Sequence, residues 1–495
     1  MRILFLYPKW TSDYGEISHF AKKAGVWPPL NIAYLAAIAE KFGHKVKIID
    51  AEVENLSLTK MVDEVVSFNP DLIGMTATTP FFHLVERAAC LIKLALPCVS
   101  VLLGGVHITV LKEKAFKHCF DYGFVGEADE SFPAFLKKYD SKESVSDIPG
   151  ILFRDGKNIK YTGDVSPVIN MDSLLWPAYH LLKMDKYRIG TLQGIKNFAT
   201  IMTVRGCPFK CIFCSTKVFG KNVRMRSPQL IIDEIKHIKK RYNINHFIFL
   251  DDTLTMNRDH ILKICELIIK EKLNITFEGS TRANLVDEKI IAKLSEAGMI
   301  RISFGLESVD ENIRKLMRKE VPLESYVIAN KITNKYGIET LNSCMIGLPG
   351  ETKDTIKKTL SFLRDTYEVK QANISIAVPY PGTELYDMAK KEMHGLKLIV
   401  DDFSKFRRYN VSVMKVGDLS PEDLIRFQND AFASIYLPPW RWMPVLRKSG
   451  FLGLILTFKR LIKSIACGHF ELVFISKKYW KLKLATGNMK HAKDY

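Results

Sequence analysis

Three cysteines stand close together in the chain with the spacing C-x3-C-x2-C, namely Cys207, Cys211 and Cys214. At this spacing three thiolates can converge on one metal centre, and thiolate sulfur selects zinc, copper(I) or an iron–sulfur cluster. A structural zinc site needs four ligands, usually in two close pairs, but the next cysteine or histidine along the chain is His237. The pattern therefore favours a four-iron cluster, whose open iron binds a substrate or cofactor, over zinc or a disulfide.

The motif from Arg205 to Ser215 resembles the signature of the radical S-adenosylmethionine (SAM) enzymes, and Phe213 before the third cysteine also matches it. In that superfamily the three cysteines hold a [4Fe–4S] cluster whose open iron binds SAM. An electron from the cluster cleaves SAM to a 5′-deoxyadenosyl radical, which removes a hydrogen atom from the substrate. The resemblance implies that the three cysteines are the metal ligands and that the cofactors, rather than a catalytic side chain, carry the reaction.

Residues 1–138 alternate short apolar runs with helix patterns, which predicts an α/β domain with a parallel sheet covered on both faces. Ligands of such sheets bind beyond the carboxyl ends of the strands. The residues that follow the third, fourth and fifth expected strands are polar or glycine: Thr76, Thr78, Gly104, Gly105, His107, Gly126 and Glu127. Each one alone fits a turn or a helix cap, but together they predict a nucleotide-like ligand at this rim.

This domain, placed directly before the cysteine motif, resembles the Rossmann-like cobalamin-binding domain of the cobalamin-dependent radical SAM enzymes. The resemblance rests on Pro28-Pro29-Leu30, on residues 104–109 and on residues 125–129. It implies that the rim residues bind cobalamin. The D-x-H-x-x-G motif, which supplies a histidine beneath cobalt in other cobalamin proteins, is absent from residues 1–138. This motif is commonly missing in that subfamily, so the resemblance implies that cobalamin binds without a histidine on its lower face.

Residues 139–198 are expected to form a connector with a hairpin at Ile151–Tyr161, whose Asp155-Gly156 pair suits the turn. From residue 199 to residue 390, six strand–helix units follow, and the cysteine loop comes after the first strand. This order resembles the partial (β/α)6 barrel, an open form of the TIM barrel, of the radical SAM enzymes.

The strand ends of the expected barrel are polar, and the active residues of such barrels sit at the carboxyl ends of the strands. A carboxylate there can hydrogen-bond the amino group or ribose of SAM, an arginine can pair with its carboxylate, and a glycine turn lets the backbone approach adenine. The candidates for SAM binding are Phe213, Asp251, Ser280, Arg282, Glu307, Gly347 and Leu348. The alternatives are helix capping by Asp251 and a plain turn at Gly347.

The chain of 495 residues carries a formal net charge of +18, much of it near the end. Residues 391–495 are expected to be basic and mostly helical; from Pro438 onward, twelve Lys or Arg residues stand against two acidic ones, a net charge of +10. With its tryptophans, this tail fits peripheral contact with an anionic membrane or, equally, a solvated basic face. No RNA-binding module accompanies it, so no nucleic-acid partner is expected.

These observations predict a cobalamin-dependent radical SAM methyltransferase that acts on an unactivated carbon by way of a 5′-deoxyadenosyl radical and methylcobalamin. The expected partners are a small-molecule substrate, such as a lipid or a tetrapyrrole, and an electron donor of the flavodoxin or ferredoxin type. Nine cysteines without a paired framework indicate the cytoplasm. One alternative function is ring closure, rearrangement or C–C bond formation with the same cofactors; another is a cobalamin sensor with a structural metal site.

Overall fold

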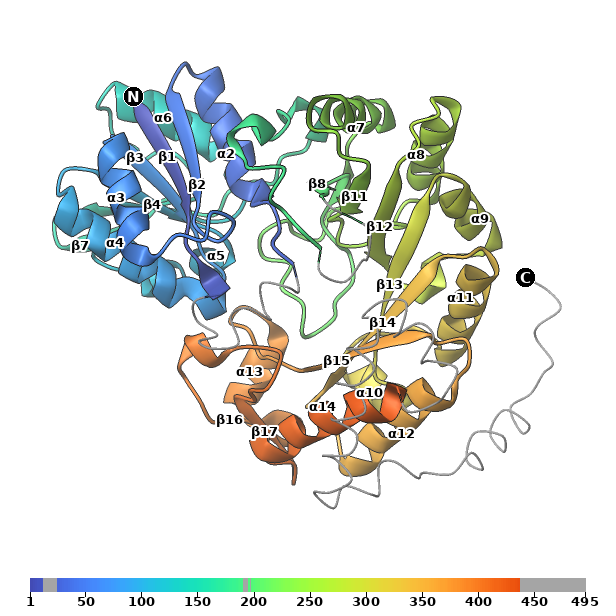
Figure 1. Ribbon diagram of the computed structural model, residues 1–495. Coiled ribbons are helices and arrows are strands. Elements are labelled where there is room, and N and C mark those ends of the chain that lie inside the picture. The colour runs from blue at the N-terminus through green and yellow to red at the C-terminus, as the bar shows by residue number, and fades with distance from the viewer. Residues whose placement is uncertain (12–24, 190–194, 196, 437–495) are drawn as a thin grey trace.

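The computed structural model describes residues 1–11, 25–189, 195 and 197–436, which form two α/β units side by side (Figure 1). The first unit is a seven-stranded sheet of order β2-β1-β3-β4-β5-β6-β7. Its strands are β1 (Arg2–Tyr7), β2 (Lys45–Asp50), β3 (Leu72–Thr76), β4 (Ser100–Gly104), β5 (Tyr122–Phe124), β6 (Ile151–Asp155) and β7 (Asn158–Tyr161). Strands β1 to β5 are parallel, as the alternating pattern predicts.

Helices cover both faces of this sheet because its strands are apolar on both sides. Ile3 and Phe5 of β1 pack toward α2 and α6, whereas Leu4 and Leu6 pack toward α3 and α4. The helices of this unit are α2 (Leu30–Lys41), α3 (Leu58–Phe68), α4 (Phe82–Ala95), α5 (Val106–Leu111) and α6 (Ser131–Asp140). The predicted α/β architecture is therefore confirmed.

The predicted hairpin forms as β6 and β7, with its turn at Gly156, which has the positive φ of +59° that this position needs. Strand β6 pairs antiparallel with β5, so the hairpin continues the first sheet. The sheet thus extends past residue 138 into the segment expected to be a connector. The rest of that segment runs to the second unit, and Ala178 donates a backbone hydrogen bond of 2.9 Å to Ala33 of α2.

The second unit is a sheet of six parallel strands in the order β15-β14-β13-β12-β11-β8, and in Figure 1 its strands curve with helices along the outer side. The strands are β8 (Ala199–Ile201), β11 (His246–Phe249), β12 (Thr276–Thr281), β13 (Met299–Glu307), β14 (Glu339–Ile346) and β15 (Gln371–Ile376). The helices are α7 (Pro228–Tyr242), α8 (Arg258–Lys270), α9 (Glu288–Glu296), α10 (Glu311–Leu316), α11 (Leu323–Lys335) and α12 (Lys353–Asp365). The partial (β/α)6 barrel is confirmed.

The chain after the barrel returns toward the first unit. Its elements are α13 (Glu384–Lys390), β16 (Leu396–Leu398), the short turn η8 (Phe403–Lys405), β17 (Met414–Val416) and α14 (Pro421–Tyr436). Helix α14 packs on β15 and α12, and η8 contacts α4 and the turn η2 (Thr79–Phe81) of the first sheet. The basic tail from Pro438 lies outside the described residues. Within the described ranges, no helix is long and apolar enough to cross a membrane.

Two glycines with a positive φ differ in their surroundings. One lies in the barrel and the other in the hairpin of the first sheet. Gly298, between α9 and β13, has a φ of +101°, and a Cβ there would lie 2.1 Å from the carbonyl oxygen of Ile275. Gly156 also has a positive φ, but a Cβ at this turn would meet no neighbouring atom within 4 Å. We expect Gly156→Ala to lower the free energy of unfolding by about 1–2 kcal/mol, and Gly298→Ala by about 3 kcal/mol or more. Denaturant unfolding measures both, and equal losses would contradict the packing described.

Candidate active site

The three cysteines lie on a loop whose two ends are tied together. Strands β9 (Val204–Arg205) and β10 (Arg224–Met225) pair antiparallel at its base. Gly206 begins the loop with a φ of +91°, and a Cβ there would lie 2.2 Å from the carbonyl oxygen of Asn222. Only glycine fits this position without moving the opposite side of the loop. We call residues 206–223 the cluster loop.

The middle of the cluster loop is anchored to the barrel through Ile212. Its backbone amide donates to the carbonyl oxygen of Met317 at 3.2 Å, and its carbonyl oxygen accepts from the amide of Leu385 at 2.9 Å. Ile212 is itself buried. Because Ile212 follows Cys211 directly, these two bonds set the position of the cysteines against the barrel.

Cys207 and Cys211 are partly buried, with cations beside Cys211, whereas Cys214 is exposed. The Sγ of Cys211 accepts from the Arg282 guanidinium at 3.8 Å, and the Sγ of Cys207 lies 3.8 Å from the Thr253 hydroxyl. Burial raises the pKa of Cys211, while Lys319 and Arg282 act to lower it. Burial also raises the pKa of Cys214 to about 11. Binding to a metal centre offsets this cost because it stabilises the thiolates.

The cysteines fit a cluster better than a single ion. Among the residues that the structure describes, no three Cys, His, Asp or Glu side chains are grouped closely enough to hold one metal ion. In an iron–sulfur cluster the thiolates bind different irons, so they need not meet at one point. The donor set of three thiols beside two cations therefore fits the cluster and disfavours the zinc alternative.

Three of the candidate SAM-binding residues surround the cysteines. Glu307, at the end of β13, has a left-handed φ of +62° and pairs with Lys319 at 2.7 Å. The ammonium of Lys319 in turn lies 5.7 Å from the ring centre of Phe213. The guanidinium of Arg282 lies 3.7 Å from the ring centre of Phe209. Side chains of both charges therefore lie beside two phenylalanine rings of the cluster loop.

Asp251 is held by its own neighbours. Its carboxylate accepts from the Thr203 amide at 2.6 Å, the Thr203 hydroxyl at 2.5 Å and the Val204 amide at 2.9 Å. Burial raises its pKa to about 6. Both oxygens are engaged just before the cluster loop, so Asp251 fixes where the loop begins.

The other three candidates have different surroundings. The amides of Gly347 and Leu348 donate to Glu351 at 2.5 and 3.1 Å, so the glycine turn is closed by its own carboxylate. Burial raises the pKa of Glu351 to about 8. The Ser280 side chain is exposed near the carboxyl end of β12. SAM contact at the seven candidate positions remains a prediction.

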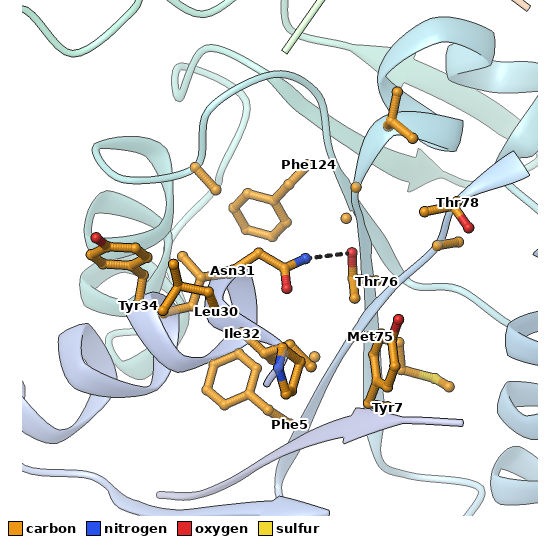
Figure 2. Close-up of a pocket in the computed structure, with 18 of the residues that line it drawn as sticks. Phe5, Tyr7, Leu30, Asn31, Ile32, Tyr34, Met75, Thr76, Thr78 and Phe124 are labelled. Atoms are coloured by element: carbon orange, nitrogen blue, oxygen red, sulfur yellow. Dashed lines mark hydrogen bonds between the residues drawn. The ribbon is translucent and has the colours of Figure 1, made fainter. Parts of the chain in front are cut away.

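A cavity of about 520 Å³ lies at the carboxyl edge of the first sheet and reaches the cluster loop. Six of the seven predicted rim residues line it: Thr76, Thr78, Gly104, Gly105, Gly126 and Glu127. Aromatic and aliphatic side chains form most of the remaining wall. Figure 2 shows Asn31 among them, with its side-chain amide donating to the Thr76 hydroxyl at 3.0 Å. From the second unit, Arg205, Phe219 and Leu250 complete the lining.

The cavity suits a large, mostly apolar ligand. Gly105 has a φ of +95°, and a Cβ there would lie 2.6 Å from the Thr76 Oγ1, so glycine keeps the rim open. No histidine occurs among the described residues that line the cavity. The open rim and the apolar wall fit the face of a large flat cofactor such as the corrin ring.

His107 is the rim residue that does not line the cavity. It is buried, stacks on Phe82 with ring centres 4.2 Å apart, and lies 3.3 Å from the Thr79 hydroxyl. Burial lowers its pKa to about 4, so the imidazole is neutral. The structure therefore places His107 in the core and outside the cavity lining, and cobalamin contact at this residue stays a prediction.

Sequence reasoning missed three charged residues of the site: Arg205, Arg224 and Lys319. All three are buried. Arg205 and Arg224 bracket the cysteine loop, and this symmetry is the one signal in the sequence that could have found them. Lys319 follows a short helix far from the motif, and only the fold brings it to Glu307.

A Rossmann-like domain with an apolar rim cavity, joined to a partial barrel with a three-cysteine loop, defines an enzyme with two cofactor sites. The chain matches the radical SAM superfamily over residues 201–363 and the B12 binding domain over residues 19–136. It is 31% identical over 415 residues to an uncharacterized methyltransferase of Pyrococcus horikoshii, covering 83% of this chain and 88% of that one. The chain belongs to the cobalamin-dependent radical SAM enzymes, and its cofactors are a [4Fe–4S] cluster, SAM and cobalamin.

Two further proteins are similar to this chain, one in sequence and the other in fold. The anaerobic magnesium-protoporphyrin IX monomethyl ester cyclase of Rubrivivax gelatinosus is 30% identical over 438 residues, 86% of this chain and 75% of the relative. The radical SAM methyltransferase TsrM of Kitasatospora setae, solved with cobalamin and a [4Fe–4S] cluster bound, matches with a TM-score of 0.66. At 14% identity over 80% of each chain, TsrM shares the fold.

The cluster assignment is tested by removing one thiol at a time. We expect Cys207→Ala, Cys211→Ala and Cys214→Ala each to lose the iron and sulfide that the anaerobically reconstituted wild type binds, because each cysteine holds one iron. Cys98, which is exposed and lies far along the chain, is the matched control, and Cys98→Ala is expected to keep full iron. Full iron in a variant of the motif, or zinc in the wild type, would contradict the assignment.

Proposed function

We propose that this protein transfers a methyl group to an unactivated carbon of a small molecule. The observation that carries the proposal is that the cluster loop reaches the cavity at the rim of the first sheet, because Val218 and Phe219 of this loop line it together with six rim residues, so the two cofactor sites adjoin. When bound, the cluster and SAM supply a radical that removes a hydrogen atom, and cobalamin supplies the methyl group. The work of the chain is to hold the reacting groups together and to exclude water.

The charged residues beside the cysteines suit the amino-acid end of SAM. Glu307 carries a carboxylate that can bind the SAM ammonium, and Arg282 carries a guanidinium that can bind its carboxylate. The side chains of Glu307 and Lys319 are each 8% exposed, and such burial strengthens their electrostatic interactions. Phe213 can pack against the bound cofactor. Asp251 and the Gly347 turn hold the surrounding backbone.

The interior of the barrel offers room for the substrate. Along β12 to β15 the residues that face the outer helices are buried, whereas most of the alternating residues in the middle of the strands are only partly buried or exposed. Four of these are serines, namely Ser280, Ser303, Ser343 and Ser375. Below them, Arg301 and Glu278 form a buried ion pair of 3.5 Å at the amino end of the strands. The substrate therefore enters from the carboxyl ends, where the cluster loop lies.

The substrate class and the cellular location of the protein are inferred from the chemistry of its residues and from its relatives. We propose a lipid or a tetrapyrrole, because one relative is named for a tetrapyrrole ester and the basic tail with its tryptophans suits an amphiphilic substrate. The protein is proposed to act in the cytoplasm with an electron donor of the flavodoxin or ferredoxin type. The basic tail, with its net charge of +10, suits contact with the inner face of an anionic membrane.

The second candidate function is ring closure without methyl transfer, favoured by the likeness to the cyclase over 86% of this chain. The two functions differ in the mass of the product. Methylation adds one CH2, whereas oxidative ring closure removes hydrogen.

Isotope transfer tests the proposal directly. The reconstituted enzyme, with cobalamin, a reductant and SAM that carries a deuterated methyl group, is incubated with an extract from cells that lack the gene. We expect both 5′-deoxyadenosine and S-adenosylhomocysteine, and a product that has gained the labelled methyl group. A product with less hydrogen and no label would establish the cyclase function instead. Absence of 5′-deoxyadenosine would contradict an enzyme of this class.

The SAM assignment is tested at Glu307. We expect Glu307→Gln to weaken SAM binding to the cluster-loaded protein by about tenfold, or ~1.4 kcal/mol, because one charge-assisted hydrogen bond is lost. The control is Glu278→Gln, which removes a buried carboxylate at the opposite end of the barrel. Equilibrium dialysis measures both. An unchanged affinity in Glu307→Gln, or an equal loss in the control, would exclude Glu307 as a SAM contact.

A further inference from the structure

Glu127, at the rim of the first sheet, is a buried carboxylate with two arginine partners from the second unit. It accepts from Arg224 at 2.9 Å and from Arg205 at 3.2 Å, and a second Arg224 nitrogen contacts its other oxygen. Its side chain is 1% exposed, and those of Arg205 and Arg224 are 4% and 8% exposed. Burying a carboxylate this deeply costs free energy unless cations with good geometry pair with it.

The two arginines hold the base of the cluster loop. Arg205 and Arg224 stand opposite each other in the β9–β10 pair, so they are the residues at which the loop begins and ends. The Glu127 carboxylate of the cobalamin-binding unit therefore contacts the residues on both sides of the loop that carries the cysteines.

Further bonds make the contact a network. Asp129, two residues after Glu127, accepts two hydrogen bonds from Arg205, at 2.7 and 3.3 Å. Arg224 also donates to the carbonyl oxygens of Val168 and Phe219, both at 2.7 Å. The network thus joins the sheet rim, the connector and the cluster loop.

The network borders the cavity. Glu127, Asp129 and Arg205 all line it, and the Arg205 guanidinium lies 5.6 Å from the ring centre of Tyr34 and 5.1 Å from that of Phe219. Two carboxylates and two guanidinium groups balance in charge. Because the Glu127 oxygens are occupied by arginine, its place is beside the cofactor and not as its ligand.

We propose that Glu127, Asp129, Arg205 and Arg224 are positioning residues that fix the separation between cobalamin and the [4Fe–4S] cluster. We call these four residues the latch. The inference rests on the two-cofactor assignment and not on the identity of the methyl acceptor. Reactions that pass between two bound groups depend steeply on their separation and orientation, which a rigid buried ion network can hold.

The test measures that separation in the loaded enzyme. Pulsed electron paramagnetic resonance gives the distance distribution between cob(II)alamin and the reduced cluster, and it needs no substrate. We expect a narrow distribution in the wild type. In Glu127→Gln the two arginines lose their shared partner, and we expect a broader distribution shifted to longer distance with unchanged iron and cobalamin content.

Three further variants separate the effect of this network from a general loss of folding. Asp129→Asn removes only an Arg205 partner, and we expect it to broaden the distribution less than Glu127→Gln. Arg205→Lys keeps the charge but loses the fork that reaches both carboxylates, and we expect the same partial effect. Glu278→Gln breaks a buried pair within the barrel alone and is expected to keep the narrow distribution even if its thermal midpoint falls.

A wild-type distribution in Glu127→Gln or Asp129→Asn would overturn the latch and leave the two-cofactor assignment standing. Equal broadening in Glu278→Gln would also overturn it, because a general loosening would then explain the effect. Failure of the wild type to bind cobalamin and a cluster together would contradict the proposed function itself. The failures of the two proposals are therefore distinguishable.

Discussion

The arrangement of the two units depends on buried charges that must be paired. Moving an ion from water into protein costs several kcal/mol, and a partner with good geometry is needed to offset it. Glu127 lies in one unit, whereas Arg205 and Arg224 lie in the other, and all three are buried. Because the pairs join the two units, they stabilise the contact between the rim of the first sheet and the base of the cluster loop. The cavity lies at that contact.

Parallel sheets explain why the functional groups gather at this meeting place. In both units the loops that follow the strands leave from the carboxyl edge, where ligands of α/β folds bind. The rim loops after β3 and β4 and the cluster loop after β8 line the same cavity. Its apolar walls exclude water, which strengthens every electrostatic contact around it. The parallel topology brings the loops to one edge of each sheet, and the buried ion pairs hold the two units in a fixed relative position.

The strands, helices and cysteine site were predictable because their signals are local. Alternating apolar runs marked both sheets, and the spacing of three cysteines marked the cluster loop. The ionic partners were not predictable, because pairing joins residues far apart in sequence: Glu127 and Arg205 are separated by 78 positions. The surroundings of His107 were also not predictable, because its position after β4 suggested the rim whereas its ring packs against Phe82 in the core. Asp251 likewise lies at a strand end, yet it binds the backbone beside it.

One chain is expected to hold an iron–sulfur cluster and cobalamin at the same time, and metal analysis of the anaerobically reconstituted full chain tests this most directly. We expect about four irons and one cobalt per chain, with a cobalt spectrum that shows no histidine nitrogen. Zinc in place of iron, cobalt that displaces iron, or a histidine ligand on cobalt would contradict it.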